Sequence, residues 1–358
     1  MKKFALIITL LALTLAGCGL LPDGESPGRE LQITDSTGHT ATLAGLPRRI
    51  AIAGKATIMV QDTIYLYQEA SERVTALENR KQSAFAFLPI VDPGLPDKQI
   101  FEINVGPEQI AAARPDLVIM KNYLADSLGT PLEQLSIPVI YLNLETPQAF
   151  YDDVRVLGEV FGNPDRAAQI VDFYQSRVSK VEELTLGVAE KPSVLVLSYS
   201  EDGGEVAFSV PPVSWLQTSM VETAGGIPVW KDLEASGGWT VVNLEQIAAW
   251  DPDQIYLIDY SGGAAQIAAD LKENPIWTGL QAVQNDRLYA FAYDFYSWDQ
   301  PDTRWILGLE WLATKIHPDQ TDSIDILAEV NAFYQEMYFL DQDTIEAQVL
   351  PILRGDIP

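Results

Sequence analysis

Short apolar runs alternate with amphipathic stretches over most of the chain, an order that predicts an α/β protein. Residues 31–43 alternate apolar and polar side chains around the turn sequence Asp35-Ser36-Thr37-Gly38, so they predict a β-hairpin. The apolar run 49–54 predicts a buried strand, and the stretch 59–70 predicts the helix after it. Further strands are predicted at 73–77, 116–120 and 138–143, which completes a first lobe over residues 30–147.

A long helical region is predicted next, over residues 148–186, with a break at Asn163-Pro164-Asp165. Its apolar stripe at helical spacing comprises Ala168, Val171, Tyr174, Val178, Val181 and Leu184. We expect residues 148–190 to join two lobes as one long interlobe helix, which permits only a small tilt between them. A second αβ lobe is predicted over residues 191–358, with strands at 193–199, 254–259 and 287–293 and closing helices at 301–316, 322–339 and 343–353.

One segment occurs twice in this pattern. Residues 108–120 and 245–257 share Glu-Gln-Ile-Ala-Ala and then Pro-Asp in the same register, 137 positions apart. Each copy predicts a short helix that a proline ends and a buried strand follows. A unit used twice at this spacing indicates two similar, Rossmann-like lobes with a ligand cleft between them. The alternative is a chance similarity between two αβ units.

The N-terminus predicts where the protein resides. Lys2 and Lys3 precede an uncharged apolar run, and small residues lead to Cys18, so residues 1–17 predict a bacterial lipoprotein signal peptide. Cys18 is then the lipidated residue, and 18–29 form a flexible tether rich in Gly and Pro. The apolar run is too short to span a bilayer, which takes about 20 residues. We therefore expect an extracytoplasmic protein held at the outer face of the cell membrane by its lipid alone; an ordinary signal peptide is the alternative.

Composition and motifs exclude several classes of function. The net charge of −27 would repel nucleic-acid phosphates, so nucleic-acid binding is excluded. One cysteine permits no internal disulfide, and two histidines are too few for a typical site for a bare transition metal. No nucleophile elbow lies near a histidine, and neither a zinc-protease motif nor a phosphate-binding glycine loop occurs. The 50 acidic residues leave a glycosidase carboxylate pair as the open enzyme alternative.

Several further motifs occur in a fixed order along nearly the whole mature chain. They are Asp35-Ser36-Thr37-Gly38, Pro47-Arg48-Arg49-Ile50, the two repeats, Ala224-Gly225-Gly226, residues 280–289, residues 309–313 and His317-Pro318. In this order they resemble the class III (helical-backbone) substrate-binding proteins of bacterial ABC importers, the group that takes up iron–siderophores, haem, cobalamin and related metal chelates. The resemblance implies a binding protein without enzymatic activity or an intrinsic cofactor.

The resemblance also implies partners. In this family a glutamate at the start of each lobe's repeated helix meets arginines of the membrane permease, and Glu108 and Glu245 match these positions. The expected partners are thus an ABC permease with its ATPase and a small anionic metal chelate, bound by a monomer. The alternative is that each glutamate only stabilises the N-terminus of its own helix.

Ligand contacts in αβ lobes gather on the loops after strand ends. In the first lobe these loops carry basic residues and one tyrosine, namely Lys55, Arg80, Lys81, Lys121 and Tyr123. In the second lobe they carry mainly aromatic residues, namely Tyr199, Trp239, Tyr260, Tyr296 and Trp298, followed by Arg304. Two other interpretations stay open: the aromatic residues belong to the core, and Arg304 pairs with Asp299 or Asp302 to hold its loop.

The basic residues of the first lobe would form a basic floor of the cleft, and the aromatic residues of the second lobe an aromatic wall. Together they suit an anionic, bulky or flat ligand. The sequence therefore favours a ferric siderophore as the cargo. Haem, cobalamin, molybdate or tungstate in the same fold are alternatives, and a surface sensor without a transport role is another.

Overall fold

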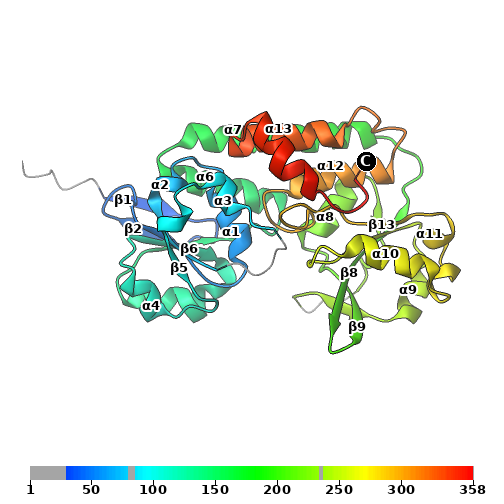
Figure 1. Ribbon diagram of the computed structural model, residues 1–358, viewed down its shortest axis with the longest axis horizontal. Helices are drawn as coiled ribbons and strands as arrows, with labels where there is room; N and C mark the ends of the chain where they lie inside the picture. Colours follow the sequence, from blue (N-terminus) through cyan, green and yellow to red (C-terminus); the bar gives the residue numbers. More distant parts are fainter. Residues whose placement is uncertain (1–29, 80–84, 234–236, 358) are drawn as a thin grey trace, which may run out of the picture.

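The computed structural model describes residues 30–79, 85–233 and 237–357. Two lobes, each built around one β-sheet, lie side by side, and long helices run along one side of both (Figure 1). The predicted α/β class with two αβ lobes is confirmed. The signal segment, Cys18 and the tether lie outside the described residues.

The first lobe contains a parallel sheet of five strands in the order β5-β4-β3-β6-β7. Its strands are β3 (Ile50–Ile52), β4 (Val74–Glu78), β5 (Gln99–Phe101), β6 (Leu117–Lys121) and β7 (Val139–Leu142). The predicted hairpin is present as β1 (Leu31–Thr34) and β2 (Thr40–Leu43), and Asp35 closes its turn by accepting hydrogen bonds from the backbone N–H groups of Thr37 and His39. The sequence missed β5, because only Phe101 of its residues is buried and no apolar run marks it.

Short helices connect these strands. They are α1 (Thr57–Ile64), α2 (Ala70–Arg73), α3 (Leu88–Val91), α4 (Pro107–Ala112) and α5 (Thr130–Gln134), with 3-10 turns at Leu95–Asp97 and Asn122–Leu124 and a π-helical turn at Ala125–Gly129. Helix α1 is buried along its whole length and ends at Ile64, whereas the sequence predicted a helix over 59–70. It packs against its own sheet and also contacts the second lobe, where its Asp62 pairs with Arg304.

The second lobe contains a six-stranded mixed sheet in the order β11-β9-β8-β12-β13, with β10 beside the start of β8. Its strands are β8 (Ser193–Asp202), β9 (Glu205–Val210), β10 (Ile227–Pro228), β11 (Thr240–Val242), β12 (Gln254–Ile258) and β13 (Leu288–Ala290). Strand β9 pairs antiparallel with β8, and β11 pairs antiparallel with β9; the sequence missed both strands. The end of β8 and the start of β9 are exposed, so this hairpin lacks the apolar run of a central strand.

The helices of this lobe are α8 (Leu216–Thr223), α9 (Leu244–Trp250), α10 (Ala264–Glu273), α11 (Gln281–Gln284), α12 (Trp305–Ile316), α13 (Ile326–Tyr338) and α14 (Gln342–Thr344). A 3-10 turn lies at Trp277–Gly279, and the chain closes with a π-helical turn (Ile345–Val349) and a 3-10 turn (Leu350–Ile352).

Helices α6 (Pro147–Phe161) and α7 (Pro164–Thr185) connect the two sheets. The predicted break lies between them: Gly162 has a positive φ of 66°, and the Asn163 side chain caps α7 by accepting from the backbone N–H of Arg166. Helix α7 packs against α12 (Figure 1). One predicted stripe position is wrong, since Ala168 is exposed, and the buried residues in this turn are Ala167 and Ile170.

The repeated segments form matching units, α4–β6 in one lobe and α9–β12 in the other. Ile110 and Ile247 are fully buried on the inner side of their helices. The aspartate of each Pro-Asp pair ties its strand to the start of a neighbouring one: Asp116 accepts from the backbone N–H groups of Arg48 and Arg49 at 2.8 and 2.9 Å. Asp253 likewise accepts from the N–H and hydroxyl of Ser193 at 2.7 and 2.8 Å. The predicted helix-then-strand unit is confirmed in both copies.

Candidate functional site

Two predicted residues of the first lobe meet around a third that the sequence missed. Lys121, at the end of β6, is fully buried; its ammonium donates to the backbone carbonyl of Asn143 and forms an ion pair with Glu145 at 2.6 Å. Tyr123 lies two residues further on and is 55% exposed. Glu145 follows β7, so the rule that selected the other loop residues also covered it.

The carboxylate of Glu145 acts electrostatically on a tyrosine in each lobe. Burial raises the pKa of Tyr123, and the carboxylate of Glu145 raises it further. Burial also raises the pKa of Tyr260 in the second lobe, and the carboxylates of Asp299 and Glu145 add to that effect. The charge of Glu145 therefore acts on one tyrosine in each lobe.

A row of aromatic rings extends from this point across the second lobe. Tyr296 stacks on Tyr260 with ring centroids 6.3 Å apart, Tyr260 meets Trp239 edge-to-face at 6.3 Å, and Trp239 meets Trp215 edge-to-face at 6.0 Å. Tyr260, Trp239 and Trp215 are half-buried, so they contribute to the surface, whereas Tyr296 is buried. The sequence missed Trp215, which caps the N-terminus of α8 and follows no predicted strand.

The aromatic loop after β13 does not form an open wall. All residues from Phe291 to Trp305 are buried, and Trp298 is 0% exposed. Phe295 packs against Phe87 of the first lobe, with ring centroids 4.8 Å apart, and against Tyr334 of α13, with ring centroids 6.2 Å apart. The interpretation that these aromatic residues belong to the core is thus the one the structure favours for Tyr296 and Trp298. Neither is a surface contact for a ligand in this conformation.

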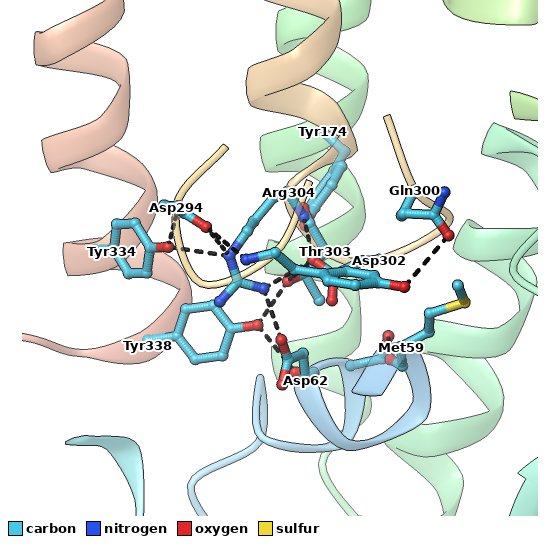
Figure 2. A network of polar contacts seen from close by, with 12 residues as sticks. Met59, Asp62, Tyr174, Asp294, Gln300, Asp302, Thr303, Arg304, Tyr334 and Tyr338 are labelled. Carbon is cyan, nitrogen blue, oxygen red and sulfur yellow. Dashed lines mark hydrogen bonds and ion pairs between the residues drawn. The ribbon is translucent and has the colours of Figure 1, made fainter. Parts of the chain in front are cut away.

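Arg304 lies at the centre of a buried polar cluster (Figure 2). Its guanidinium forms ion pairs with Asp62 at 2.6 Å and with Asp294 and Asp302 at 2.8 Å each. Tyr334 accepts a hydrogen bond from its Nε–H at 3.1 Å. Arg304 is fully buried and these carboxylates neutralise it, so the predicted ligand contact is corrected to a structural residue. The alternative pairing with Asp302 is confirmed.

The remaining predicted contacts are dispersed. Lys55 is exposed in the turn between β3 and α1, which Glu78 secures by accepting from the backbone N–H of Gly54 at 2.6 Å. Tyr199 is half-buried on β8 and donates its hydroxyl hydrogen bond to Glu201 at 2.9 Å. Arg80 and Lys81 lie outside the described residues, so the basic floor rests on Lys55 and the paired Lys121.

A separate apolar cavity of about 610 Å³ lies in the first lobe between the end of β4 and α3. Phe85, Phe87, Leu88 and Leu95 contribute to its walls. Among the predicted ligand contacts that the structure describes, none lines it, and we do not assign it to the site around Glu145.

The two repeat glutamates are both exposed in the first turn of their helices, Glu108 on α4 and Glu245 on α9. In Figure 1 these helices lie on the side of the molecule away from α7, one on each lobe. The predicted docking positions are thus accessible and belong to different lobes.

The described part of the chain has no group of three His, Cys, Asp or Glu side chains suited to a metal ion. Within the same residues, no helix combines the length and apolar character of a membrane span. The arrangement at the lobe boundary offers ring faces, one ion pair and hydrogen-bonding groups, which suits reversible binding of a small molecule.

The chain is similar to known proteins in sequence. A family model described as "periplasmic binding protein" matches residues 98–293. The iron-uptake system-binding protein of Bacillus subtilis is 22% identical over 320 residues, covering 82% of this chain and 92% of its own. The molybdate-binding protein MolA of Haemophilus influenzae is 23% identical over 258 residues, covering 66% and 70%.

Solved structures agree in fold. A periplasmic solute binding protein from Veillonella parvula superposes with a TM-score of 0.74 at 23% identity, covering 90% of this chain and 98% of its own. MolA of Haemophilus influenzae bound to molybdate gives 0.70 at 16% identity, covering 87% and 98%. The resemblance seen in the sequence is confirmed, and the chain belongs to the periplasmic binding protein family, which binds substrates for ABC transporters.

Proposed function

We propose that this protein is an extracytoplasmic lipoprotein, anchored through Cys18, that captures a metal chelate between its lobes and delivers it to an ABC permease. The observation that carries the proposal is the half-buried row of Tyr260, Trp239 and Trp215 in the second lobe, with the charge of Glu145 from the first lobe acting on Tyr260. Binding sites of two-lobed proteins lie at such boundaries. A ferric siderophore is the favoured cargo, supported by the iron-uptake relative in Bacillus subtilis.

Molybdate is the second candidate, because a relative at similar identity is a molybdate-binding protein. A bare oxyanion needs several free N–H donors or cations. Here the ammonium of Lys121 is already bound to Asn143 and Glu145. The half-buried aromatic rings offer little to a small oxyanion but a large contact area to an organic chelate. This balance favours the chelate.

A thermal-shift screen tests the cargo. Ferric siderophores of the hydroxamate, catecholate and carboxylate classes, hemin, cobalamin and molybdate are each added to the mature protein. We expect one ferric siderophore to raise the melting temperature, since a ligand that binds only the folded state stabilises it, and to quench the fluorescence of Trp239 and Trp215. A shift with molybdate alone would overturn the chelate proposal, and no shift with any compound would overturn the binding site.

Uptake of the identified cargo tests docking. The double change Glu108→Lys and Glu245→Lys reverses the charge of both exposed residues, and we expect transport to fall while cargo affinity in solution stays unchanged. The matched control is Glu183→Lys, an exposed glutamate on α7 on the other side of the molecule (Figure 1). Uptake that survives the double change, or falls equally in the control, would contradict docking through these glutamates.

The lipid anchor has its own test. Cys18→Ser removes the thiol that would carry the lipid, and we expect the protein to leave the membrane fraction. Retention in the membrane fraction after this change would contradict anchoring through Cys18.

A further inference from the structure

A buried carboxylate lies behind the aromatic row and has only neutral partners among the described residues. Asp299 is fully buried, and its Oδ2 accepts hydrogen bonds from Gln217 at 3.0 Å, Gln300 at 2.9 Å and the Tyr260 hydroxyl at 3.0 Å. Its Oδ1 accepts from the hydroxyl of Ser297. Removing a carboxylate from water without a cation is costly, so these four donors are what stabilises it in this place.

The partners of Asp299 connect two of the three segments that carry the half-buried rings. Gln217 is on α8, two residues after Trp215 at one end of the row. Tyr260, in the middle of the row, follows β12. One carboxylate therefore fixes α8 relative to the loop after β12, and with it the spacing of Trp215 and Tyr260, the two rings that Trp239 contacts.

The same contacts occupy the hydroxyl of Tyr260. It donates to Asp299 and accepts from the side-chain N–H of Gln300. Burial and the nearby carboxylate of Asp299 raise the pKa of this phenol, so it stays protonated at neutral pH. The hydroxyl of Tyr260 is thus engaged with two side chains of the protein, although the residue as a whole is only half-buried.

We propose that Asp299 is a positioning residue that holds the hydroxyl of Tyr260 inward, so that the cargo meets the ring of Tyr260 together with Trp239 and Trp215. The cargo is then held through the faces and edges of rings, and no tyrosine phenolate at this position bonds to its metal. This assignment rests on the proposed function, because it takes the row as part of the cargo site. It requires a cargo that arrives as a complete chelate with an organic shell.

The first experiment needs no ligand. Fluorotryptophan is incorporated, and the ¹⁹F resonances of Trp215 and Trp239 are assigned with Trp215→Phe and Trp239→Phe. We expect Asp299→Asn to shift both resonances, as Tyr260→Ala does, because the row loses its common support. The matched control is Asp92→Asn, a buried carboxylate of the first lobe that also accepts from a tyrosine hydroxyl, that of Tyr65. Unchanged resonances in a folded Asp299→Asn protein would overturn the positioning role.

The second experiment compares two changes at Tyr260, with ferric enterobactin and hemin as probes. Tyr260→Phe keeps the ring, and we expect the dissociation constant to change less than about threefold. Tyr260→Ala removes the ring and should weaken binding by about fivefold or more. Equal losses in both variants would show that the hydroxyl binds the cargo and would overturn the ring-only assignment.

The outcomes separate the two proposals. If neither probe binds the wild-type protein, the cargo assignment fails for them, while the ¹⁹F comparison still decides whether Asp299 positions the row. If Asp299→Asn is too unstable to study, Gln217→Ala removes one of its donors from α8 and is expected to shift the Trp215 resonance more than the Trp239 resonance. An unshifted Trp215 resonance in that variant would overturn the link through α8.

Discussion

Arg304 and Asp62 form a fully buried ion pair, with Nη1 and Oδ2 2.6 Å apart, although the residues are 242 positions apart in the chain. Asp62 belongs to α1 of the first lobe, and Arg304 directly precedes α12 in the second. The guanidinium also lies 4.5 Å from the ring centre of Phe87, another residue of the first lobe. The lobes are thus joined by a buried polar and aromatic contact in addition to α7, which supports the expectation of a small closing motion.

Removing Arg304 should destabilise the protein severely. Arg304→Ala leaves three buried carboxylates, Asp62, Asp294 and Asp302, without their cation, and breaking a buried ion pair in this way costs about 3–5 kcal/mol. Urea unfolding followed by circular dichroism measures the loss. Arg155→Ala is the control: its exposed pair with Asp152 should contribute less than about 1 kcal/mol. Similar losses in both variants would contradict the structural role of Arg304.

Glu310 should make stability depend on pH. It is fully buried on α12; burial, with the nearby Glu329, raises its pKa from 4.5 to about 8, while Arg177 and Lys180 act in the opposite direction. Between these two pKa values the folded state keeps a proton that the unfolded state has lost. The free energy of unfolding therefore falls as pH rises through this window, by up to about 1.4 kcal/mol per pH unit from this group.

Glu310→Gln removes this ionisation, so the variant should gain stability relative to wild type as pH rises from about 5 to about 8. Urea unfolding of both proteins across this range measures the difference, which cancels the contribution of other titrating groups. A difference that does not change with pH would contradict the assignment.

The two aspartates of the repeat should have similar roles. Asp116→Ala removes the acceptor of two backbone N–H groups, and Asp253→Ala removes the acceptor of one N–H and one hydroxyl group. Each loss should cost about 1–3 kcal/mol, measured by urea unfolding. Asp165→Ala, an exposed aspartate in the first turn of α7, should cost less than about 1 kcal/mol. A negligible effect in one repeat alone would show that the two units are not equivalent.

Gly308 should not tolerate a side chain. A Cβ atom there would lie 2.2 Å from the backbone carbonyl oxygen of Trp298, so Gly308→Ala must push α12 away from the buried loop. We expect a loss of about 1–3 kcal/mol or more. Gly279→Ala is the control, because nothing lies within 4 Å of the corresponding position. Equal thermal stability of the two variants would contradict this close contact.

Much of the fold follows from local periodicity. The apolar runs located β3, β4, β6, β7, β8, β12 and β13, and helical spacing with a proline break located α6 and α7. The strands that were missed, β5, β9, β10 and β11, are short or largely exposed at the sheet margins. These strands form by pairing with neighbouring strands, and no run of apolar side chains in the sequence indicates them.

The candidate site follows from the sequence less well. The rule that ligands meet loops after strand ends selected Tyr123 and Tyr260, and it also covered Glu145. It equally selected Trp298 and Arg304, which are fully buried. An aromatic or basic residue after a strand shows the same sequence pattern whether it is exposed or buried between the lobes. Its burial therefore depends on the tertiary packing and does not follow from the local sequence.

The sequence by itself determined the two-lobed α/β architecture, the repeated unit with Glu108 and Glu245, and the family, because these depend on residues near one another in the chain. The tertiary structure alone decided that the loop from Phe291 to Trp305 is buried, that Arg304 pairs with Asp62, and that Asp299 stands behind Tyr260. The physical reason is that these contacts join segments far apart in sequence. Whether a charge or a ring meets water or a partner depends on which distant segment packs against it.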